Sequence, residues 1–109
     1  MSYLRKQGNS LWVNITCDTI PTIDNVWTHW EGVWNIAATL GSTPLLTGSL
    51  VRSSTTGVFQ LRIGPVSVAG WATLPAGNYI LTIQIDNAAV DYRIEESYGL
   101  TIKPQGLTP

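Results

Sequence analysis

The chain has 109 residues and a net charge of −1, with 44% hydrophobic and only 12% charged residues. That length corresponds to one domain, and its apolar fraction is sufficient to build a core. Because an average domain has roughly 25% charged residues, neutral polar side chains must cover much of this surface, and neighbouring copies repel each other weakly. The composition suits a subunit packed into an assembly, and a neutral monomer is the alternative.

Charge and cysteine content argue against several classes of function. The six Lys and Arg residues are scattered along the sequence, so we expect no nucleic-acid binding through phosphate neutralisation. No apolar run approaches the roughly 20 residues of a membrane span, and the polar segment after Lys6 does not fit a signal peptide. The lone Cys17 excludes an intramolecular disulfide and is compatible with a reducing cytoplasm.

The first half of the chain contains two clear strand patterns. Alternation over 11–16 predicts a first strand, and residues 33–40 predict a second, in which Trp34 and Ile36 share a face. Between them, residues 17–31 show no sustained period, which predicts a long loop with a short strand near 26–28.

Residues 45–53 predict a third strand, in which Gly48 indicates a bulge. Residues 58–63 predict a fourth strand, with Phe59, Leu61 and Ile63 on one face. Residues 66–73 fit either one short helical turn or a strand-like crossover.

The segment from Leu74 to Lys103 carries the most regular pattern. Apolar residues fall at every second position from Tyr79, which predicts a strand with one buried face. The core face is predicted to hold Tyr79, Leu81, Ile83 and Ile85, and the outer face Ile80, Thr82 and Gln84. A turn at 86–89, a strand over 90–95, a break at 97–99 and a last strand from Leu100 complete an antiparallel meander of three short strands.

This meander resembles the closing strands of a small immunoglobulin-like β-sandwich domain in virion proteins of tailed bacteriophages, of the baseplate, tail-fibre and decoration type. In that family the segment often reads L-P-x-G-x-Y, followed by a strand ending in Asp, a short turn, a polar strand, a glycine and an apolar strand. The matching residues are Leu74, Pro75, Gly77, Tyr79, Ile83, Gln84, Ile85, Asp86, Tyr92, Gly99 and Ile102. The opening Gly8–Val13 is similar to the first strand of such domains. The resemblance also implies a short helix over 66–73.

We therefore predict an all-β fold, an immunoglobulin-like antiparallel β-sandwich of about seven strands. Residues 9–103 form the single domain, flanked by an N-terminal arm at 1–8 and a flexible tail at 104–109. Both ends are polar and short, so we expect them to extend onto a neighbouring subunit rather than to pack on their own domain.

The tryptophans are the unusual feature, with five in 109 residues. Trp34 suits the buried position on an early strand of an immunoglobulin-like sandwich. Trp27 and Trp30 flank His29 in the aperiodic loop, where alternation cannot bury both in one sheet face.

We assign Trp27, His29 and Trp30 as candidate partner-binding residues, and expect at least one of Trp27 and Trp30 to be buried against another subunit. Loss of Trp30 would then leave the stability of the isolated domain nearly unchanged. Core filling and an aromatic platform for sugars are the alternatives.

Residues with catalytic chemistry are few. His29 is the only histidine and Cys17 the only cysteine, so a His/Cys metal site lacks ligands and a Cys–His nucleophilic pair lacks an orienting group. Asp91, Glu95 and Glu96 lie close together in the sequence, and Asp91 and Glu95 are expected to share a solvated strand face, where charges discourage edge pairing. We therefore expect no enzyme activity, no cofactor and no metal.

These observations are interpreted as a non-catalytic structural component of a tailed-phage virion, in the tail, baseplate, fibre or capsid, assembled in the bacterial host cytoplasm. The expected partners are other virion structural proteins, in a homo-oligomer or symmetric assembly, without nucleic acid or membrane. The alternative is a carbohydrate- or host-receptor-binding β-sandwich module.

Overall fold

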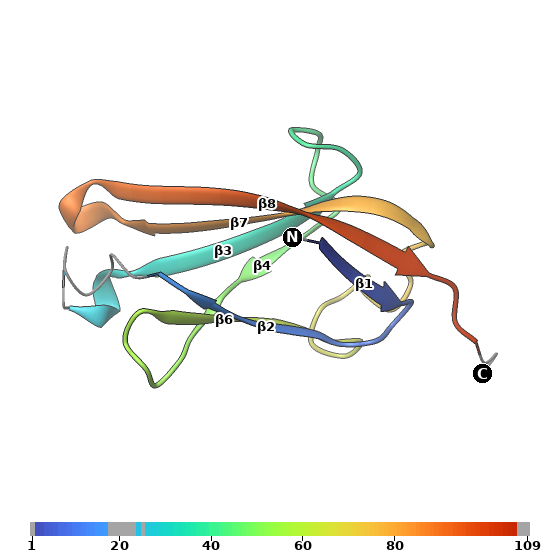
Figure 1. The fold of residues 1–109 in the computed structure, drawn as a ribbon, viewed down its shortest axis with the longest axis horizontal. Helices are drawn as coiled ribbons and strands as arrows, with labels where there is room; N and C mark the ends of the chain where they lie inside the picture. The colour runs from blue at the N-terminus through green and yellow to red at the C-terminus, as the bar shows by residue number, and fades with distance from the viewer. Residues whose placement is uncertain (1, 18–23, 25, 107–109) are drawn as a thin grey trace.

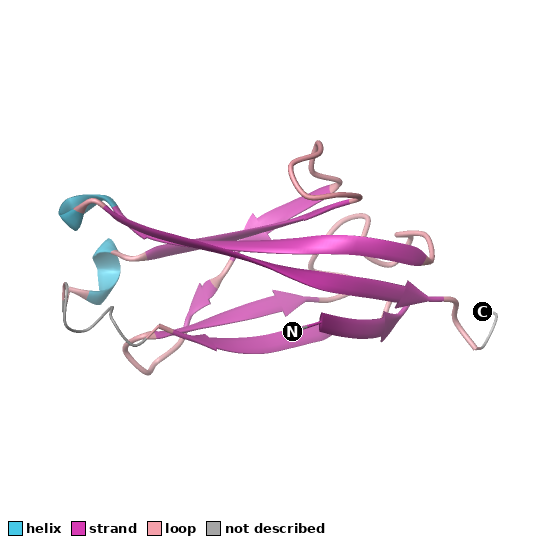
Figure 2. Cartoon of the chain, turned by 45° about the horizontal axis from the view of Figure 1, so that its top comes forward, coloured by secondary structure: helices cyan, strands magenta, loops and turns pink. Residues whose placement is uncertain are grey.

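The computed structural model describes residues 2–17, 24 and 26–106. The strands of this part are β1 (Ser2–Lys6), β2 (Leu11–Thr16), β3 (Glu31–Ala37), β4 (Leu46–Ser49), β5 (Val51–Arg52), β6 (Val58–Ile63), β7 (Gly77–Asn87) and β8 (Tyr92–Lys103). Two short 3-10 helices, η1 (Trp27–His29) and η2 (Ala88–Val90), lie at the same end of the molecule (Figure 2). None of the helices in the described part of the chain has the length and apolarity of a membrane-spanning segment.

The strands form two sheets that face each other. The larger sheet has the order β1-β8-β7-β3-β4 and the smaller sheet the order β2-β6-β5. Figure 1 shows the smaller sheet as a second layer beneath the larger one. All neighbouring pairs are antiparallel except β1 and β8, which run parallel. The prediction of an all-β fold is confirmed.

Alternate side chains of the strands fill the space between the two sheets. The buried apolar residues are Leu11, Cys17, Trp30, Trp34, Ile36, Ala37, Leu50, Phe59, Leu61, Ile63, Trp71, Leu74, Leu81, Ile83, Ile85, Leu100 and Ile102. On β7 the predicted core face is confirmed, since Leu81, Ile83 and Ile85 are buried and Tyr79 packs against the core. Trp34 on β3 is also buried, as its position predicts.

The predicted third strand, 45–53, is divided between the two sheets. Its first part, β4, pairs with β3 in the larger sheet, whereas β5 pairs with β6 in the smaller one. The change takes place at Leu50, whose N–H donates to the carbonyl oxygen of Gly32 at 2.7 Å. A Cβ atom at Gly32 would lie 2.6 Å from Leu50 Cδ1, so the missing side chain there makes room for the crossing residue.

Gly48 does not form the predicted bulge. It pairs in regular register with Trp34, and a Cβ atom at this position would lie 2.6 Å from the Trp34 indole ring. The glycine therefore gives the indole the space that a side chain would occupy. Packing of one large side chain, rather than a break in the ladder, explains why glycine stands here.

The closing meander has two long strands instead of three short ones. The predicted break at 97–99 is absent, because Ser97 pairs with Thr82 and Gly99 with Ile80 within one continuous β8. At the other end of β7, the predicted turn is the short helix η2. The Asn87 side chain begins this helix by accepting a hydrogen bond from Ala89 N, and Asp91 ends it in the left-handed region with φ of 53°.

The predicted N-terminal arm is instead the edge strand of the larger sheet. Ser2–Lys6 pairs in parallel with residues 99–103 of β8, and the Tyr3 ring packs edge-on against Tyr98 at 5.8 Å. The expectation that this segment extends onto a neighbouring subunit is therefore wrong. In the tail, Gln105 Nε2 donates to the carbonyl oxygen of Gln7 at 3.1 Å, and residues 107–109 lie outside the described part.

Three smaller predictions also change. The second strand ends at Ala37 rather than at residue 40, and residues 26–28 lead into η1 rather than forming a strand. Residues 64–74 make successive hydrogen-bonded turns rather than the short helix that the resemblance implies, and the bond from Val68 N to the carbonyl oxygen of Gly64 closes a single helical turn. Trp71, buried within these turns, donates from Nε1 to the carbonyl oxygen of Asn9 at 2.9 Å and closes one end of the core. The loop predicted over 17–31 lies partly outside the described residues.

Candidate interaction site

The three predicted partner-binding residues lie at and just after η1, and two of them belong to the domain's own packing. Trp30 is 0% exposed, its Nε1 donates to the carbonyl oxygen of Asp24 at 3.0 Å, and its ring lies edge-on to Tyr92. Trp27 is half-buried, and its ring centroid lies 5.0 Å from that of Phe59. His29 is exposed.

This arrangement corrects the prediction for Trp30. Its side chain fills the core of its own domain and not a subunit interface, so we instead expect its loss to lower the stability of the isolated domain. Trp27 donates from Nε1 to the carbonyl oxygen of Ser53 at 3.3 Å and keeps part of its surface in solvent. Of the three residues, Trp27 and His29 therefore remain available to a partner.

Asp24 is the centre of a polar cluster beside these aromatic rings. Its carboxylate accepts from Val26 N at 2.9 Å and from Asn87 Nδ2 at 2.7 Å, and His29 Nδ1 lies 2.9 Å from Oδ2. The Asn87 bond, followed by the Val26 bond, lowers the pKa of Asp24 below its ordinary value. Asn87 itself is buried and uses its Oδ1 to accept from Ala89 N. The cluster thus ties the segment before η1 to the β7–β8 hairpin.

A different region, at one flank of the molecule, leaves strand edges uncovered. On the side away from β7, β8 pairs with β1 only from Gly99 to Lys103, so within the described residues Arg93–Tyr98 has no second neighbouring strand. The outer strand of the smaller sheet on this side is β2. We call this uncovered side, between β2 and the first half of β8, the open flank. Exposed strand edges of this kind are templates for pairing with another chain.

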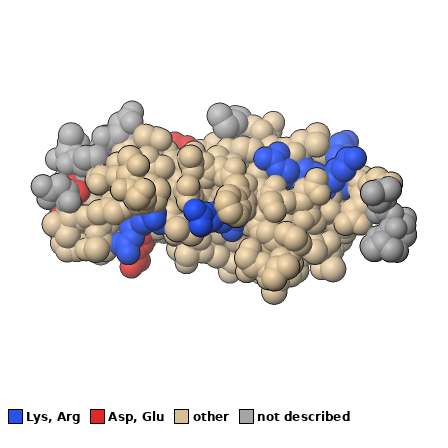
Figure 3. All heavy atoms as spheres, turned by 90° about the horizontal axis from the view of Figure 1, so that it is seen from below, with Lys and Arg blue, Asp and Glu red and all other residues tan. Residues whose placement is uncertain are grey.

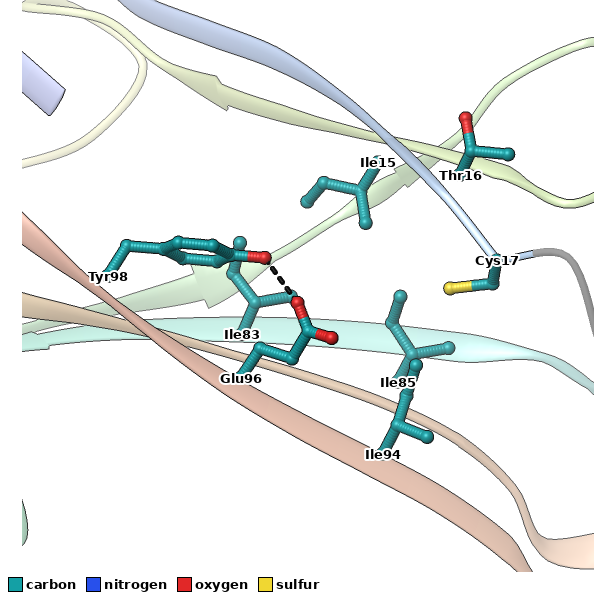
Figure 4. A pocket seen from close by; sticks show the side chains of 8 residues that line it. All are labelled: Ile15, Thr16, Cys17, Ile83, Ile85, Ile94, Glu96 and Tyr98. Carbon is teal, nitrogen blue, oxygen red and sulfur yellow. Dashed lines mark hydrogen bonds between the residues drawn. The ribbon is translucent and has the colours of Figure 1, made fainter. Parts of the chain in front are cut away.

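A pocket of about 200 Å³ opens between the two sheets at the open flank (Figure 4). Its walls come from the end of β2, from β7 and from β8. The lining residues are Ile15, Thr16, Cys17, Ile83, Ile85, Ile94, Glu96 and Tyr98. The pocket is thus mainly apolar, with a few polar groups near one another, which is the usual chemistry of a binding site.

Glu96 and Tyr98 supply the polar pair of this pocket. The Tyr98 hydroxyl donates to Glu96 Oε2 at 2.5 Å, as Figure 4 shows. This bond and, after it, burial raise the pKa of Tyr98 to about 12, so the phenol keeps its proton at neutral pH. Glu96 lies on the same side of β8 as Ile94 and lines the pocket, although it is exposed to solvent at the pocket opening.

Trp12 forms a second exposed feature, on the outer face of the smaller sheet. It is 64% exposed, and the Arg62 guanidinium lies 4.9 Å from its ring centroid. Arg62 also donates to Gln60 Oε1 at 2.5 Å. Together with Asn14 these residues line a shallow hollow of about 250 Å³. An exposed aromatic face beside amide and guanidinium groups can stack and donate hydrogen bonds.

The exposure of Trp12 has a signal in the sequence, which lies in the alternation of its strand. Leu11, Val13 and Ile15 alternate with Trp12 along the predicted strand, and once Leu11 is buried the alternation places Trp12 on the outer face. The inward direction of Glu96 follows from the same rule applied to Ile94 and Tyr98. The sequence pattern does not predict the uncovered edge of β8, because this edge depends on how far the pairing with β1 extends.

Within the described residues, no three His, Cys, Asp or Glu side chains are close enough to hold a metal ion. No family model, curated protein or solved structure matches the chain. Its function is therefore inferred from its own sequence and geometry.

Proposed function

We propose that the chain is an immunoglobulin-like structural subunit of a tailed-phage virion, acting without catalysis through contacts with other virion proteins. The observation that carries the contact role is the open flank, where an uncovered strand edge borders an apolar pocket. The geometry of this pocket suits an extended segment of a partner, with main-chain bonds to β8 and an apolar side chain in the pocket.

Strand order supports the immunoglobulin-like assignment. In such sandwiches the second, fifth and fourth strands of the basic set form one sheet, and the third, sixth and seventh form the other, to which variable-type domains add strands beside the third. Here β2-β6-β5 and β4-β3-β7-β8 follow that order. Trp34, buried on β3, occupies the strand on which these domains place a core tryptophan.

Tyr79 adds a second, independent resemblance. Its hydroxyl donates to the carbonyl oxygen of Pro75 at 2.6 Å, four residues upstream. A tyrosine near the start of the sixth strand that bonds back to the preceding backbone is the tyrosine corner of immunoglobulin-like sandwiches. This bond gives the tyrosine of the L-P-x-G-x-Y segment a structural role, because its hydroxyl ties the start of β7 to the preceding turn.

The virion assignment is supported by the resemblance of residues 74–103 in sequence to the closing segment of the phage domains, although β8 is continuous here, and by the charge-poor composition. With 12% charged residues, the surface repels neighbours weakly, as suits a crowded assembly. Within that assignment, the partners are other virion structural proteins and the place of action is the particle, assembled in the bacterial cytoplasm.

Purified particles test this proposal. We expect mass spectrometry of density-purified tailed particles, from bacteria that carry the gene, to find peptides of the chain, and immunogold labelling to place it on the particles. A chain found only in the soluble fraction of lysed cells would contradict the proposal.

A pair of variants tests the role of the open flank. Ile94→Arg places a charge in the pocket, whereas Val33→Arg places the same charge on the exposed outer face of β3. We expect incorporation into particles to fall for Ile94→Arg alone, after denaturant unfolding has shown that both variants fold. Equal incorporation of two folded variants would exclude the open flank as the contact.

Trp12 favours one alternative function, that of a carbohydrate- or receptor-binding module. Its exposed ring next to Asn14, Gln60 and Arg62 is compatible with stacking on a sugar. A glycan array followed by fluorescence titration tests this alternative. Sugar binding that is lost in Trp12→Ala and kept in Trp27→Ala would support it, and absence of binding across the array would remove it.

A further inference from the structure

Three of the six basic side chains are brought together by the parallel pairing of β1 with β8. Lys6 lies directly opposite Lys103, and Arg5 opposite Ile102. We call Arg5, Lys6 and Lys103 the basic end. Within the described residues, neither lysine takes part in an ion pair.

The carboxylates gather at the other end of the same strand. The described ones are Asp24, Glu31, Asp86, Asp91, Glu95 and Glu96, and we call this set the acidic end. Asp91 directly precedes β8 and Lys103 ends it, so at about 3.3 Å per residue these two residues lie roughly 40 Å apart. Figure 3 shows Lys and Arg reaching one end of the molecule, and the visible Asp and Glu only in the opposite half.

Two arginines lie within the acidic end without neutralising it. Arg93 pairs with Asp86 at 3.3 Å, and Arg52 donates to the carbonyl oxygens of Trp27 and Trp30. Six carboxylates against these two arginines leave a clear excess of negative charge. The net charge is only −1, but the positive and negative charges are separated between the two ends of a molecule that is 48 Å along its longest axis.

Like charges also face each other across the strand ladders at both ends. Lys6 stands opposite Lys103, and Glu31 stands opposite Asp86. Directly opposite like charges destabilise a sheet, and at the acidic end Arg93 offsets part of this repulsion through its ion pair with Asp86. A surface of the opposite sign placed over either pair would relieve that repulsion.

We propose that the basic end of one copy docks on the acidic end of the next, so that the chain associates head-to-tail with further copies of itself. Such a contact joins two different patches, and it produces rings if the rotation closes or filaments if it does not. This inference rests on the proposed role as a structural subunit, and it names the partner as a second copy.

Chemical cross-linking tests the orientation directly. Lys6 and Lys103 are the only lysines in the sequence, and a carbodiimide condenses a lysine amine with a carboxylate only where the two are in contact. Because Asp91 lies at the far end of β8, an amide between Lys103 and Asp91 must join two copies. We expect mass spectrometry of the cross-linked wild type to find links from the lysines to Asp91, Glu95 or Glu31.

Sedimentation at two salt concentrations tests the strength of the contact. We expect association in about 20 mM salt and its loss in about 500 mM salt, where the screening length falls well below 10 Å. Lys6→Glu with Lys103→Glu, and separately Glu31→Lys with Glu95→Lys, should each weaken association at least tenfold at low salt. Arg62→Glu is the matched control, because it reverses a charge on the outer face of the smaller sheet and should leave association unchanged.

The inference would be overturned if the protein were a monomer at every salt concentration. It would also be overturned if the lysines were cross-linked only to residues at the basic end and never to the acidic end. Equal weakening by Arg62→Glu would overturn it as well, since net charge alone would then explain the result. Tight binding to heparin without self-association would instead identify the basic end as a site for a polyanion. A monomer that is nevertheless found in purified particles would overturn this inference and leave the proposed function standing.

Discussion

At the scale of single residues, Trp30 shows how a side chain in an aperiodic segment becomes part of the core. Its burial depends on Tyr92 and on the backbone of Asp24. Tyr92 is far away in sequence, so alternation around residue 30 contains no sign of that contact. The burial of Trp30 is therefore determined by tertiary packing, and the local sequence pattern does not predict it.

We expect Trp30→Ala to lower the free energy of unfolding by about 3–5 kcal/mol, because a large buried side chain is lost and a cavity remains. The indole hydrogen bond to Asp24 is lost as well. Urea denaturation measures the change, with Trp12→Ala as the control, since Trp12 is 64% exposed. Equal small losses for both variants would mean that Trp30 is not part of the core.

Asp24 gives a prediction about pH. Its pKa is lowered from 3.8 in the folded chain, first by Asn87 and then by Val26, so its stabilising effect is present above the unfolded value. That effect is lost as the pH falls below about 4 and through the lowered native pKa. We expect the unfolding free energy of the wild type to fall more steeply over this acid window than that of Asp24→Asn. Parallel curves would show that the Asp24 cluster does not contribute.

At the scale of elements, side-chain alternation predicted strands where one face is buried and failed where other forces decide. The register of β7 followed directly from Leu81, Ile83 and Ile85. By contrast, β1 has only half-buried and exposed residues, and its parallel partner is at the other end of the chain. Ser97 and Gly99 looked like a turn, but the ladders to β7 and β1 hold them in β8. Long-range pairing thus overrides local propensity.

The pairing of Gly48 with Trp34 yields a prediction at this scale. We expect Gly48→Ala to destabilise the domain by about 1–3 kcal/mol, because the added methyl group overpacks the site and meets the indole ring at 2.6 Å. Gly41→Ala is not a suitable control, since its φ of 82° brings strain of its own. Gly99→Ala is suitable, because a Cβ there meets Ser2 at an ordinary 3.6 Å. A smaller loss at Gly48 than at Gly99, by urea denaturation, would contradict this account.

At the scale of the whole molecule, the open flank and the separated charges arise from the arrangement of strands, which the sequence did not reveal. The candidate site could be predicted only in part. Alternation alone places Trp12 on the outer face of the smaller sheet and Glu96 on the side of β8 that faces the pocket. Within the described residues, the uncovered edge depends on β1 pairing with β8 only from Gly99 onward. The basic end likewise depends on Lys6 meeting Lys103, which are far apart in the chain.

Glu96 provides a test of how the open flank avoids indiscriminate pairing. An inward-pointing charge beside a bare strand edge discourages other chains from adding to the sheet. We expect Glu96→Ile to aggregate faster than wild type in light scattering at equal concentration. Glu95→Ile is the matched control, because it removes the same charge and adds the same side chain on the outer side of β8. Equal aggregation of both variants would assign the effect to hydrophobicity alone.

The parallel pairing of β1 with β8 has a mechanical consequence. Tension that enters through the start of β1 and leaves through the end of β8 pulls the two strands past each other along their length. The hydrogen bonds between Ser2–Lys6 and residues 99–103 then carry the load together, in shear, and must break as a group rather than one after another. Pulling by single-molecule force spectroscopy should therefore meet high resistance in this direction. The domain would remain folded under forces that separate an antiparallel terminal pair one bond at a time.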